Sequence, residues 1–403
     1  MISRFFTGAF LLLSLLPQNA LAFIECSVLN YGAVADNSTD LGPALTKAWQ
    51  ECVIPQVTTT VATDVLLYVP AGNYLLASTV TFDDAANWNL HIAGDIFLPF
   101  NPDLTGTMIT FEVKLCLLLS NGGSQLVDCR TARIFFSTGL APFSAMATAT
   151  APMETRPRLI RFQTCNNCEI TEITLFDSPQ FHVTIIGNNN VAHDMAIIAS
   201  HIGETDGFDM SGNNNYVHDV SVENGDECVT VKTPTNPKES PANSLLDAIL
   251  VHSVLARPEL TCSDVTISNS DAGVMIKSYP NCQGIVKNVT FTGFTLDAAA
   301  YPICMYVSIV TKPKLNTLIS MDSIDISAFW EGGTVDTGTL QISDVTFENF
   351  QGSGTPTRPG VLLDCNKATP CESIAFSGIS LTNTIADTFT NACGTGLSGL
   401  KTC

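Results

Sequence analysis

Thr205–Lys232 reads TDGFDMSGNNNYVHDVSVENGDECVTVK, and this stretch decides the fold. It carries two short acidic clusters about twenty residues apart, and an apolar, β-prone segment follows each cluster. The clusters are Asp206 with Asp209, and Asp226 with Glu227. This arrangement predicts a fold in which the chain returns to the same place every twenty-odd residues.

The sequence pattern around these clusters recurs along the chain. In each copy a β-branched or apolar residue is followed by a polar pair and then by alternating apolar residues. The copies are Ile170–Leu175, Val191–Ile197, Val217–Val222, Cys262–Ile267, Val286–Phe291, Ile342–Phe347 and Ile374–Ile379. Short strands repeated at this period are typical of a β-solenoid, in which parallel strands stack about 4.8 Å apart. A β-sandwich is the less favoured alternative, because the hairpin dipeptides Asn-Gly and Asp-Gly are sparse.

The N-terminus has the pattern of a secretory signal. Arg4 precedes the apolar run Ala9–Leu16, and Ala20-Leu21-Ala22 is a small-residue cleavage site. We therefore predict a signal peptide over residues 1–22 and one mature domain over 23–403, secreted and without a membrane span. Within that domain, Leu41–Cys52 has a helical period and is predicted to cap the open end of the solenoid.

Charge and cysteine content fit an exported protein. Removal of Arg4 with the signal leaves 17 basic and 38 acidic residues, a net charge of 17 − 38 = −21, which argues against a nucleic-acid partner. Fourteen cysteines in an exported chain indicate disulfides. Plausible local pairs are Cys26/Cys52, Cys165/Cys168, Cys365/Cys371 and Cys393/Cys403, and Asn37 and Asn288 are glycosylation acceptors.

The acidic clusters have three interpretations. With a coil of about twenty residues, Asp206 and Asp226 fall on neighbouring rungs of one sheet, and Glu227 follows directly. Crowded carboxylates keep one group protonated beside ionised partners, as acid–base hydrolysis of a glycoside requires. A calcium site would need more oxygen ligands, and a plain solvated acidic edge is the third interpretation.

The same blocks resemble glycoside hydrolase family 28, the pectin-degrading enzymes with a right-handed parallel β-helix. Thr205-Asp206, Gly225-Asp226-Glu227-Cys228 and Met275-Ile276-Lys277 match the N-T-D, G-D-D and R-I-K motifs of that family. Glu in place of the second Asp and Met in place of Arg are similar to the rhamnogalacturonan hydrolase branch. The likeness extends from about Cys26 to Cys403 with gaps.

This resemblance implies roles for individual residues. Asp226 would be the general acid, and Asp206 and Glu227 would activate the attacking water, with inversion at the anomeric carbon. Lys277 would meet a uronic carboxylate, Lys232 is a weaker candidate for the same role, and Asp209 would orient Asp206 or hold its turn. The expected partner is rhamnogalacturonan, with no cofactor, no metal and a monomeric chain.

Four stretches depart from the family pattern and motivate alternatives. They are 113–133, 141–155, 234–261 and 304–320, and they indicate retained introns or shifted reading frames in a conceptual translation, which transcript sequencing tests. The glycine-rich loop expected after the second acidic cluster is absent, so Cys228 lacks a partner from it. The alternatives are a polygalacturonase, a xylogalacturonan hydrolase, or a catalytically impaired β-helix that binds wall polysaccharide.

Overall fold

A computed structural model gives the architecture of the chain. It describes residues 24–59, 65–112, 133–136, 142–145, 156–231, 260–306 and 339–403, apart from 84, 87, 100, 102–103, 202–203, 271 and 278–282. The predicted signal peptide lies outside these residues, as does most of the four departing stretches. Pro142–Ala145, inside one of those stretches, nevertheless forms strand β10 and joins the sheet.

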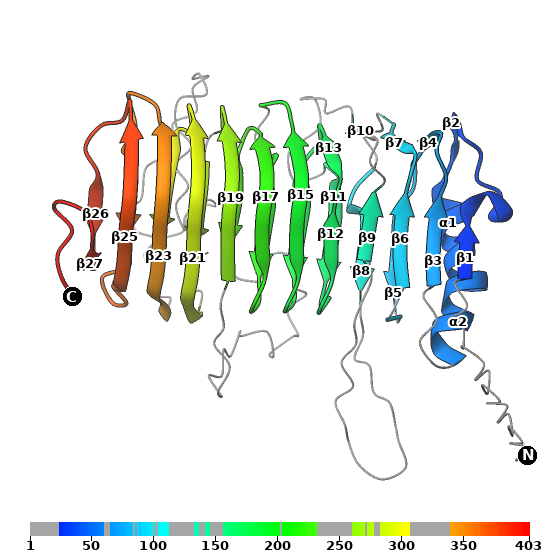
Figure 1. Cartoon of the computed structure of the whole chain (residues 1–403), viewed down its shortest axis with the longest axis horizontal. Coiled ribbons are helices and arrows are strands. Elements are labelled where there is room, and N and C mark those ends of the chain that lie inside the picture. Colours follow the sequence, from blue (N-terminus) through cyan, green and yellow to red (C-terminus); the bar gives the residue numbers. More distant parts are fainter. Residues whose placement is uncertain are drawn as a thin grey trace, which may run out of the picture.

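The strands form two parallel sheets that run the length of an elongated molecule (Figure 1). Among the described residues, the larger sheet holds 17 strands and the smaller sheet holds 10. The larger sheet consists of β1 (Ile24–Ser27), β2 (Asp36–Asp40), β3 (Val65–Val69), β4 (Asn73–Leu75), β6 (Trp88–Ile92), β7 (Asp95–Leu98), β9 (Arg133–Phe136), β10 (Pro142–Ala145), β12 (Glu169–Thr171), β13 (Thr174–Phe176), β15 (Val191–Ile198), β17 (Tyr216–Glu223), β19 (Leu260–Ser268), β21 (Gln283–Asp297), β23 (Thr339–Ser353), β25 (Cys371–Thr382) and β27 (Ala392–Thr395). The smaller sheet consists of β5 (Val80–Asp83), β8 (Thr107–Glu112), β11 (Arg158–Gln163), β14 (Val183–Ile186), β16 (Phe208–Ser211), β18 (Glu227–Val231), β20 (Ala272–Lys277), β22 (Tyr301–Tyr306), β24 (Val361–Asp364) and β26 (Thr388–Thr390).

Each coil of the chain adds strands to both sheets, and this confirms the predicted solenoid. In the smaller sheet Val183 pairs with Phe208, and Phe208 pairs with Val229, so each turn of the coil brings the chain back one strand further along. Parallel strands joined by crossovers wind in the right-handed sense. The fold is therefore the predicted right-handed parallel β-helix.

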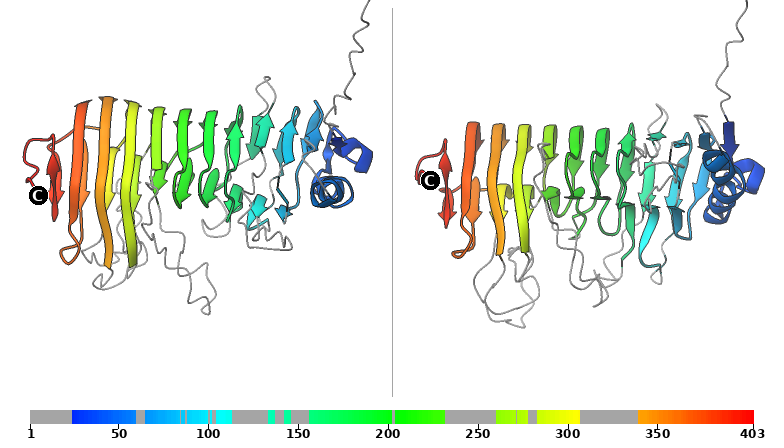
Figure 2. Two further views of the ribbon diagram at one scale, coloured as in Figure 1. Left: turned by 60° about the horizontal axis from the view of Figure 1, so that its bottom comes forward. Right: turned by 90° about the horizontal axis from the view of Figure 1, so that it is seen from below.

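Helices cover the N-terminal end of the coil (Figure 2). The predicted helix Leu41–Cys52 is found as α1 (Gly42–Ala48), a π-helical turn (Trp49–Val53) and α2 (Ile54–Thr59). A short 3-10 turn, Val28–Tyr31, precedes them. Trp49 packs into the coil against Phe82 and Trp88, at ring-centroid distances of 5.2 and 4.4 Å. The helices thus shield the sheet edge that would otherwise be exposed.

Aromatic side chains stack inside the C-terminal coils. Phe291 lies on Phe347, and Phe347 lies on Phe376, with ring centroids 5.3 and 5.0 Å apart and nearly parallel planes. All three side chains are buried. Identical positions on successive coils place like residues one above the other, because the strands are in register.

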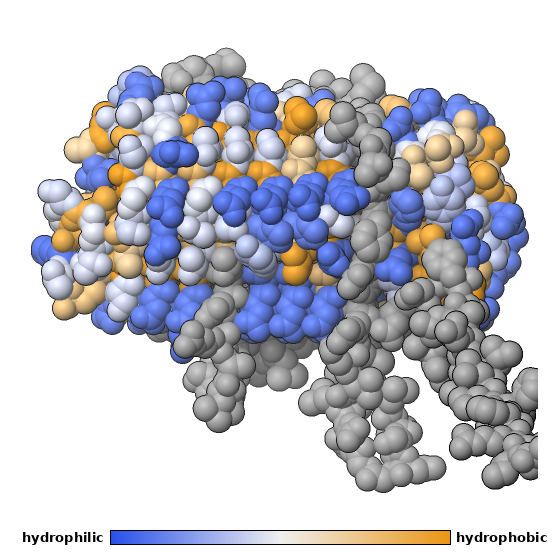
Figure 3. Space-filling model, viewed as in Figure 1, coloured by the Kyte–Doolittle hydropathy of each residue, from blue (hydrophilic) through white to orange (hydrophobic). Residues whose placement is uncertain are grey.

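Each coil bends where one residue takes a left-handed backbone conformation. Asp194, Asp219 and Asp264 have φ of 51, 50 and 54°, and the register aligns their preceding residues on three successive strands. Asp tolerates this conformation better than most L-residues. The neighbouring rings of His193 and His218 stack with centroids 4.9 Å apart. The repeated His-Asp pair therefore lies where the coil bends. Hydrophilic residues form a band across the middle coils on the face seen in Figure 3.

The four predicted local cysteine pairs are disulfide-bonded in the structure. They are Cys26–Cys52, Cys165–Cys168, Cys365–Cys371 and Cys393–Cys403. Of the two predicted glycosylation acceptors, Asn37 is exposed within β2 with φ of 50°, whereas Asn288 is half-buried within β21. Asn37 is therefore the more accessible of the two.

Candidate active site

The acidic clusters lie at the beginning of two neighbouring strands of the smaller sheet. Asp206 lies two residues before β16, and Glu227 is the first residue of β18. The register pairs Phe208 with Val229, an offset of 229 − 208 = 21 residues. This offset places Asp206 level with Glu227, and Asp226 level with Thr205. Asp206 and Asp226 therefore lie on neighbouring rungs of one sheet, as predicted, with a shift of one residue that puts Glu227 level with Asp206 because the coil is 21 residues long here.

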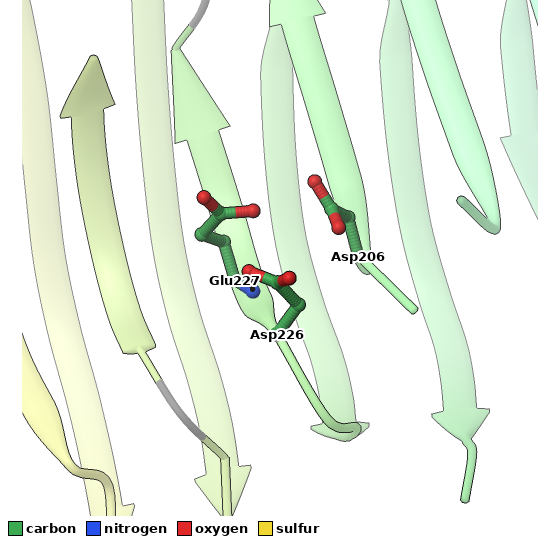
Figure 4. Close-up of side chains that lie close together, drawn as sticks. All are labelled: Asp206, Asp226 and Glu227. Carbon is green, nitrogen blue, oxygen red and sulfur yellow. Dashed lines mark hydrogen bonds between the residues drawn. The ribbon is translucent and has the colours of Figure 1, made fainter. Parts of the chain in front are cut away.

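The three carboxylates converge in spite of this shift. One oxygen from each of Asp206, Asp226 and Glu227 lies within 4.8 Å of the others. Figure 4 shows the three side chains facing one another from adjacent coils. Their exposed fractions are 1, 6 and 1%. Three buried carboxylates at this range repel one another strongly, so the cluster favours holding a proton on one of them.

The backbone binds the carboxylate of Asp226 on both sides. The N–H of Glu204 donates to Oδ2 at 3.0 Å, and the N–H of Glu227 donates to Oδ1 at 2.9 Å. These bonds fix the carboxylate plane between the two coils. N–H donors stabilise the ionised form. The geometry therefore leaves the acid assignment of Asp226 dependent on the family resemblance.

Asn224 joins the two acidic segments, and the motifs in the sequence did not identify it. Its buried Nδ2 donates to the carbonyl oxygens of Thr205 and Glu227, both at 2.9 Å. The Thr205 hydroxyl in turn accepts a bond from the N–H of Gly225 at 2.9 Å. These bonds hold the two coils at one separation and so position the carboxylates. The only sequence signal for Asn224 is that it immediately precedes Gly225-Asp226-Glu227.

His182 supports the other side of Asp206. It is fully buried, its Nδ1 bonds to the carbonyl oxygen of Asp206 at 2.9 Å, and its Nε2 accepts the N–H of Ser178 at 3.2 Å. These partners require the neutral tautomer with the proton on Nδ1. Burial lowers the pKa of His182 to about 4. The sequence shows a histidine near the site, but the structure alone gives it this supporting role.

Of the three predicted substrate-binding residues Asp209, Lys277 and Lys232, the structure describes the side chain of Asp209 alone. Asp209 lies in β16, is buried, and does not belong to the cluster of three carboxylates. Lys277 ends β20, where its backbone pairs with Tyr306, and its side chain lies outside the described part of the chain. Lys232 lies entirely outside that part. Cys228 is a free, buried thiol, and burial raises its pKa.

The cluster has the composition of a small cation site as well as that of an acid–base pair. Three carboxylate oxygens are fewer than the six to eight oxygen ligands that calcium takes. Acidic clusters also occur without any ion, so the geometry by itself leaves both chemistries available.

In the described helices, no segment is long and apolar enough to cross a bilayer.

Comparisons with known proteins bear on this site. The family model described as "Glycosyl hydrolases family 28" matches residues 111–395. Rhamnogalacturonase A of Aspergillus aculeatus is 29% identical over an alignment of 374 residues, and the match covers 88% of this chain and 72% of that protein. Rhamnogalacturonase A of Aspergillus niger is 28% identical over an alignment of 386 residues, and the match covers 91% of this chain and 74% of that protein.

Solved structures give the same fold at lower identity. Endo-xylogalacturonan hydrolase from Aspergillus tubingensis superposes with a TM-score of 0.60 at 19% identity, covering 93% of this chain and all of the other. Polygalacturonase from Erwinia carotovora ssp. carotovora gives a TM-score of 0.55 at 16% identity, covering 93% of this chain and 97% of the other. At these identities the likeness speaks for the architecture and not for the substrate.

Proposed function

The chain belongs to the glycosyl hydrolases of family 28, and from this membership we propose that it is a secreted hydrolase of the rhamnogalacturonan backbone of pectin. The observation that carries the proposal is the convergence of Asp206, Asp226 and Glu227 within 4.8 Å on adjacent coils. The relatives named rhamnogalacturonase support the choice of substrate, namely the linkage between galacturonic acid and rhamnose.

Each carboxyl group takes a part in the reaction. Asp226 protonates the glycosidic oxygen as the bond to the sugar breaks, which lets the leaving alcohol depart neutral. Asp206 and Glu227 accept the proton of a water molecule that attacks the anomeric carbon. His182 and Asn224 neither donate nor accept a proton in this scheme. They hold the acidic segments in place through the bonds to Asp206, Thr205 and Glu227.

Inversion at the anomeric carbon rests on the family rather than on the spacing. Inverting enzymes typically separate the two carboxyl groups by about 6.5–9.5 Å, whereas the nearest oxygens here lie within 4.8 Å. The configuration of the first product, read by NMR before mutarotation, tests this point. A product that retains the configuration of the substrate would assign Asp206 or Glu227 the role of nucleophile.

Reducing-sugar release from rhamnogalacturonan tests the proposed function. The wild-type protein is expected to release reducing ends, and Asp226→Asn to lose about 10²–10⁴-fold in kcat. On an oligosaccharide with a nitrophenolate leaving group the same variant should recover most of its rate, because that group leaves without protonation. Homogalacturonan and xylogalacturonan serve as competing substrates. Faster release from either one replaces rhamnogalacturonan as the substrate, and no release from any of the three favours a wall-binding protein.

The cation interpretation has its own test. An acid–base hydrolase keeps its rate after exhaustive dialysis against EDTA, whereas a calcium-dependent one loses it and regains it with added calcium. We expect the rate to be unchanged. A reversible loss would assign the cluster of three carboxylates to a metal.

A further inference from the structure

Two half-buried histidines of the larger sheet hold the same place in successive coils. His193 in β15 pairs with His218 in β17, and each is followed by an aspartate in the left-handed conformation, Asp194 or Asp219. The two imidazole rings stack with centroids 4.9 Å apart and an angle of 1° between their planes. Strands β12, β15 and β17 are neighbours in the middle of this sheet (Figure 1). The proposed reaction takes place at the other sheet and uses neither histidine.

His193 has a carboxylate at each of its ring nitrogens. Its Nδ1 lies 2.6 Å from Oδ2 of Asp194, and its Nε2 lies 3.0 Å from Oε1 of Glu169, which belongs to β12 on the preceding coil. An ionised carboxylate only accepts hydrogen bonds, so both ring nitrogens have to donate. A neutral imidazole would turn the lone pair of one nitrogen toward a carboxylate. The geometry therefore matches the protonated, cationic ring.

His218 lacks the second of these contacts. Its Nδ1 lies 2.6 Å from Oδ2 of Asp219, and within the described residues Asp219 is its only ion-pair partner. The register explains the difference, because the backbone pairs Glu169 with Val191. Val191 thus occupies, one coil further on, the place that Glu169 holds beside His193. One histidine of the stack is held between two acids, and the other has a valine in place of the second acid.

The described charged neighbours of His193 are all carboxylates. The titratable groups around its ring are Glu169 and Glu172 on the preceding coil, Asp194 on its own coil, and Tyr216, His218 and Asp219 on the next coil. The hydroxyl of Thr171 lies 3.2 Å from Nδ1 and carries no charge. Arg133 of β9 pairs with Glu169 through the backbone, and its side chain lies outside the described part of the chain. Such surroundings favour a cation at His193.

Burial and the hydrogen bonds change the pKa of His193 in opposite directions. Burial lowers the pKa because the cation loses water, whereas the bonds to Glu169 and Asp194 raise it. The bonds outweigh burial, so the pKa lies above the ordinary value of 6.5. The side chains of His193 and Glu169 are 20 and 29% exposed, so solvent screens this pair less than it screens a fully exposed one.

We propose that Glu169, His193 and Asp194 form a proton-dependent clamp that ties the coil of β12 to the coil of β15. Protonated His193 bridges the two carboxylates, and when its proton passes to solvent one of them loses its donor. The stabilisation is complete below the unfolded pKa of 6.5 and is lost as pH rises through the raised folded pKa. The clamp thus makes the β-helix more stable in acidic surroundings than in neutral ones.

Urea unfolding at two pH values tests the clamp. We compare about pH 5 with about pH 9, which lie on either side of the ordinary histidine pKa. His193→Gln keeps a donor toward Glu169 but carries no charge. Relative to the wild type, it should raise the unfolding equilibrium constant about fivefold at the lower pH and much less at the higher pH. His218→Gln, from the same position one coil on, is the matched control, and its effect should depend less on pH.

The register also offers a test by gain. Val191→Glu places a carboxylate beside His218 as Glu169 lies beside His193, with Val191→Gln as the uncharged control. Relative to that control, Val191→Glu should lower the unfolding equilibrium constant about threefold more at the lower pH than at the higher pH. The gain should disappear when His218→Gln is added. A gain that persists in the double variant would show that His218 does not carry it.

Nitrogen NMR of the imidazole rings tests the clamp in the wild-type protein, where no variant has to fold. Both ring nitrogens of His193 should stay protonated to a higher pH than those of free histidine. A His193 ring that loses its proton at a lower pH than free histidine would overturn the proposal. So would a His193→Gln effect on unfolding that is the same at both pH values, or a pH-dependent effect of His218→Gln as large as that of His193→Gln.

Discussion

Replacement of Asn224 by alanine should weaken both the fold and the reaction. The side chain donates two bonds of 2.9 Å to the buried carbonyls of Thr205 and Glu227. The Glu227 carbonyl keeps the N–H of Gly207 as a donor at 2.8 Å, so its lost bond costs about 0.5–1.5 kcal/mol, whereas the Thr205 carbonyl loses its side-chain donor at a cost of about 1–3 kcal/mol. Together these predict a loss of about 2–4 kcal/mol in the free energy of unfolding. This range already includes a large part of the stability of an ordinary domain.

The effect on catalysis follows from the same two bonds. Without Asn224, the bonds from Gly225 to Thr205 and from Glu204 to Asp226 remain, but the segment that carries Asp206 is held less firmly against the segment that carries Asp226 and Glu227. A displacement of about 1 Å between reacting groups costs on the order of 100-fold in rate. We therefore expect kcat to fall about 100-fold.

A matched variant separates positioning from stability. Asn215 is equally buried, and its Nδ2 donates to the carbonyls of Gly187 and Ser211 at 2.9 and 3.2 Å, in the turn at the other end of β16. Its Oδ1 also accepts bonds from the N–H and the Nδ2 of Asn190 at 3.1 and 3.0 Å. Asn215→Ala should therefore lose at least as much stability in urea unfolding and keep kcat within about threefold at a temperature where it is fully folded. If both variants lose kcat equally, or if Asn224→Ala keeps the wild-type kcat, the positioning argument is wrong.

Three further predictions follow. Glu227→Gln should lower kcat about 10²–10⁴-fold with KM nearly unchanged, as measured by initial rates of reducing-sugar release; an unchanged kcat would remove Glu227 from the reaction. Neutral His182 stabilises the fold above its unfolded pKa of 6.5, and this contribution of about 3 kcal/mol is lost as pH falls through the folded pKa of about 4. The free energy of unfolding of His182→Gln, measured in urea, should therefore depend less on pH between these two values than that of the wild type. Parallel pH curves for the two proteins would contradict the burial argument. Replacing Cys26 and Cys52, which are 26 residues apart, with serine should cost about 3 kcal/mol through the freed chain; a variant with the wild-type unfolding midpoint would show that the helices alone hold this end.

Much of the fold was accessible from the sequence because it repeats. Alternating apolar residues and polar turns recur at twenty-odd residues, and only a winding coil gives every copy the same surroundings. The local disulfides were also accessible, because their cysteines lie close along the chain. So was the membership of Asp206, Asp226 and Glu227 in one site, since any coil near twenty residues brings the two clusters onto adjacent strands.

The register was not accessible, because the coils differ in length and only backbone pairing between strands fixes them. Val286–Phe291 repeats the sequence pattern of Cys262–Ile267, which predicts that Val286 pairs with Cys262. In the structure Cys262 pairs with Phe291 instead. The coil length of 21 residues, which puts Glu227 rather than Asp226 level with Asp206, likewise comes only from the backbone pairing.

The sequence by itself determined that this chain winds and that its carboxylates meet, since both follow from periodicity and residue type. Only the tertiary structure decided how the carboxylates are held. Asn224 and His182 act through hydrogen bonds to neighbouring coils, and no local pattern in the sequence marks a residue for a partner about twenty positions away. Such partners exist only once the coil has closed and each strand has taken its place beside the next.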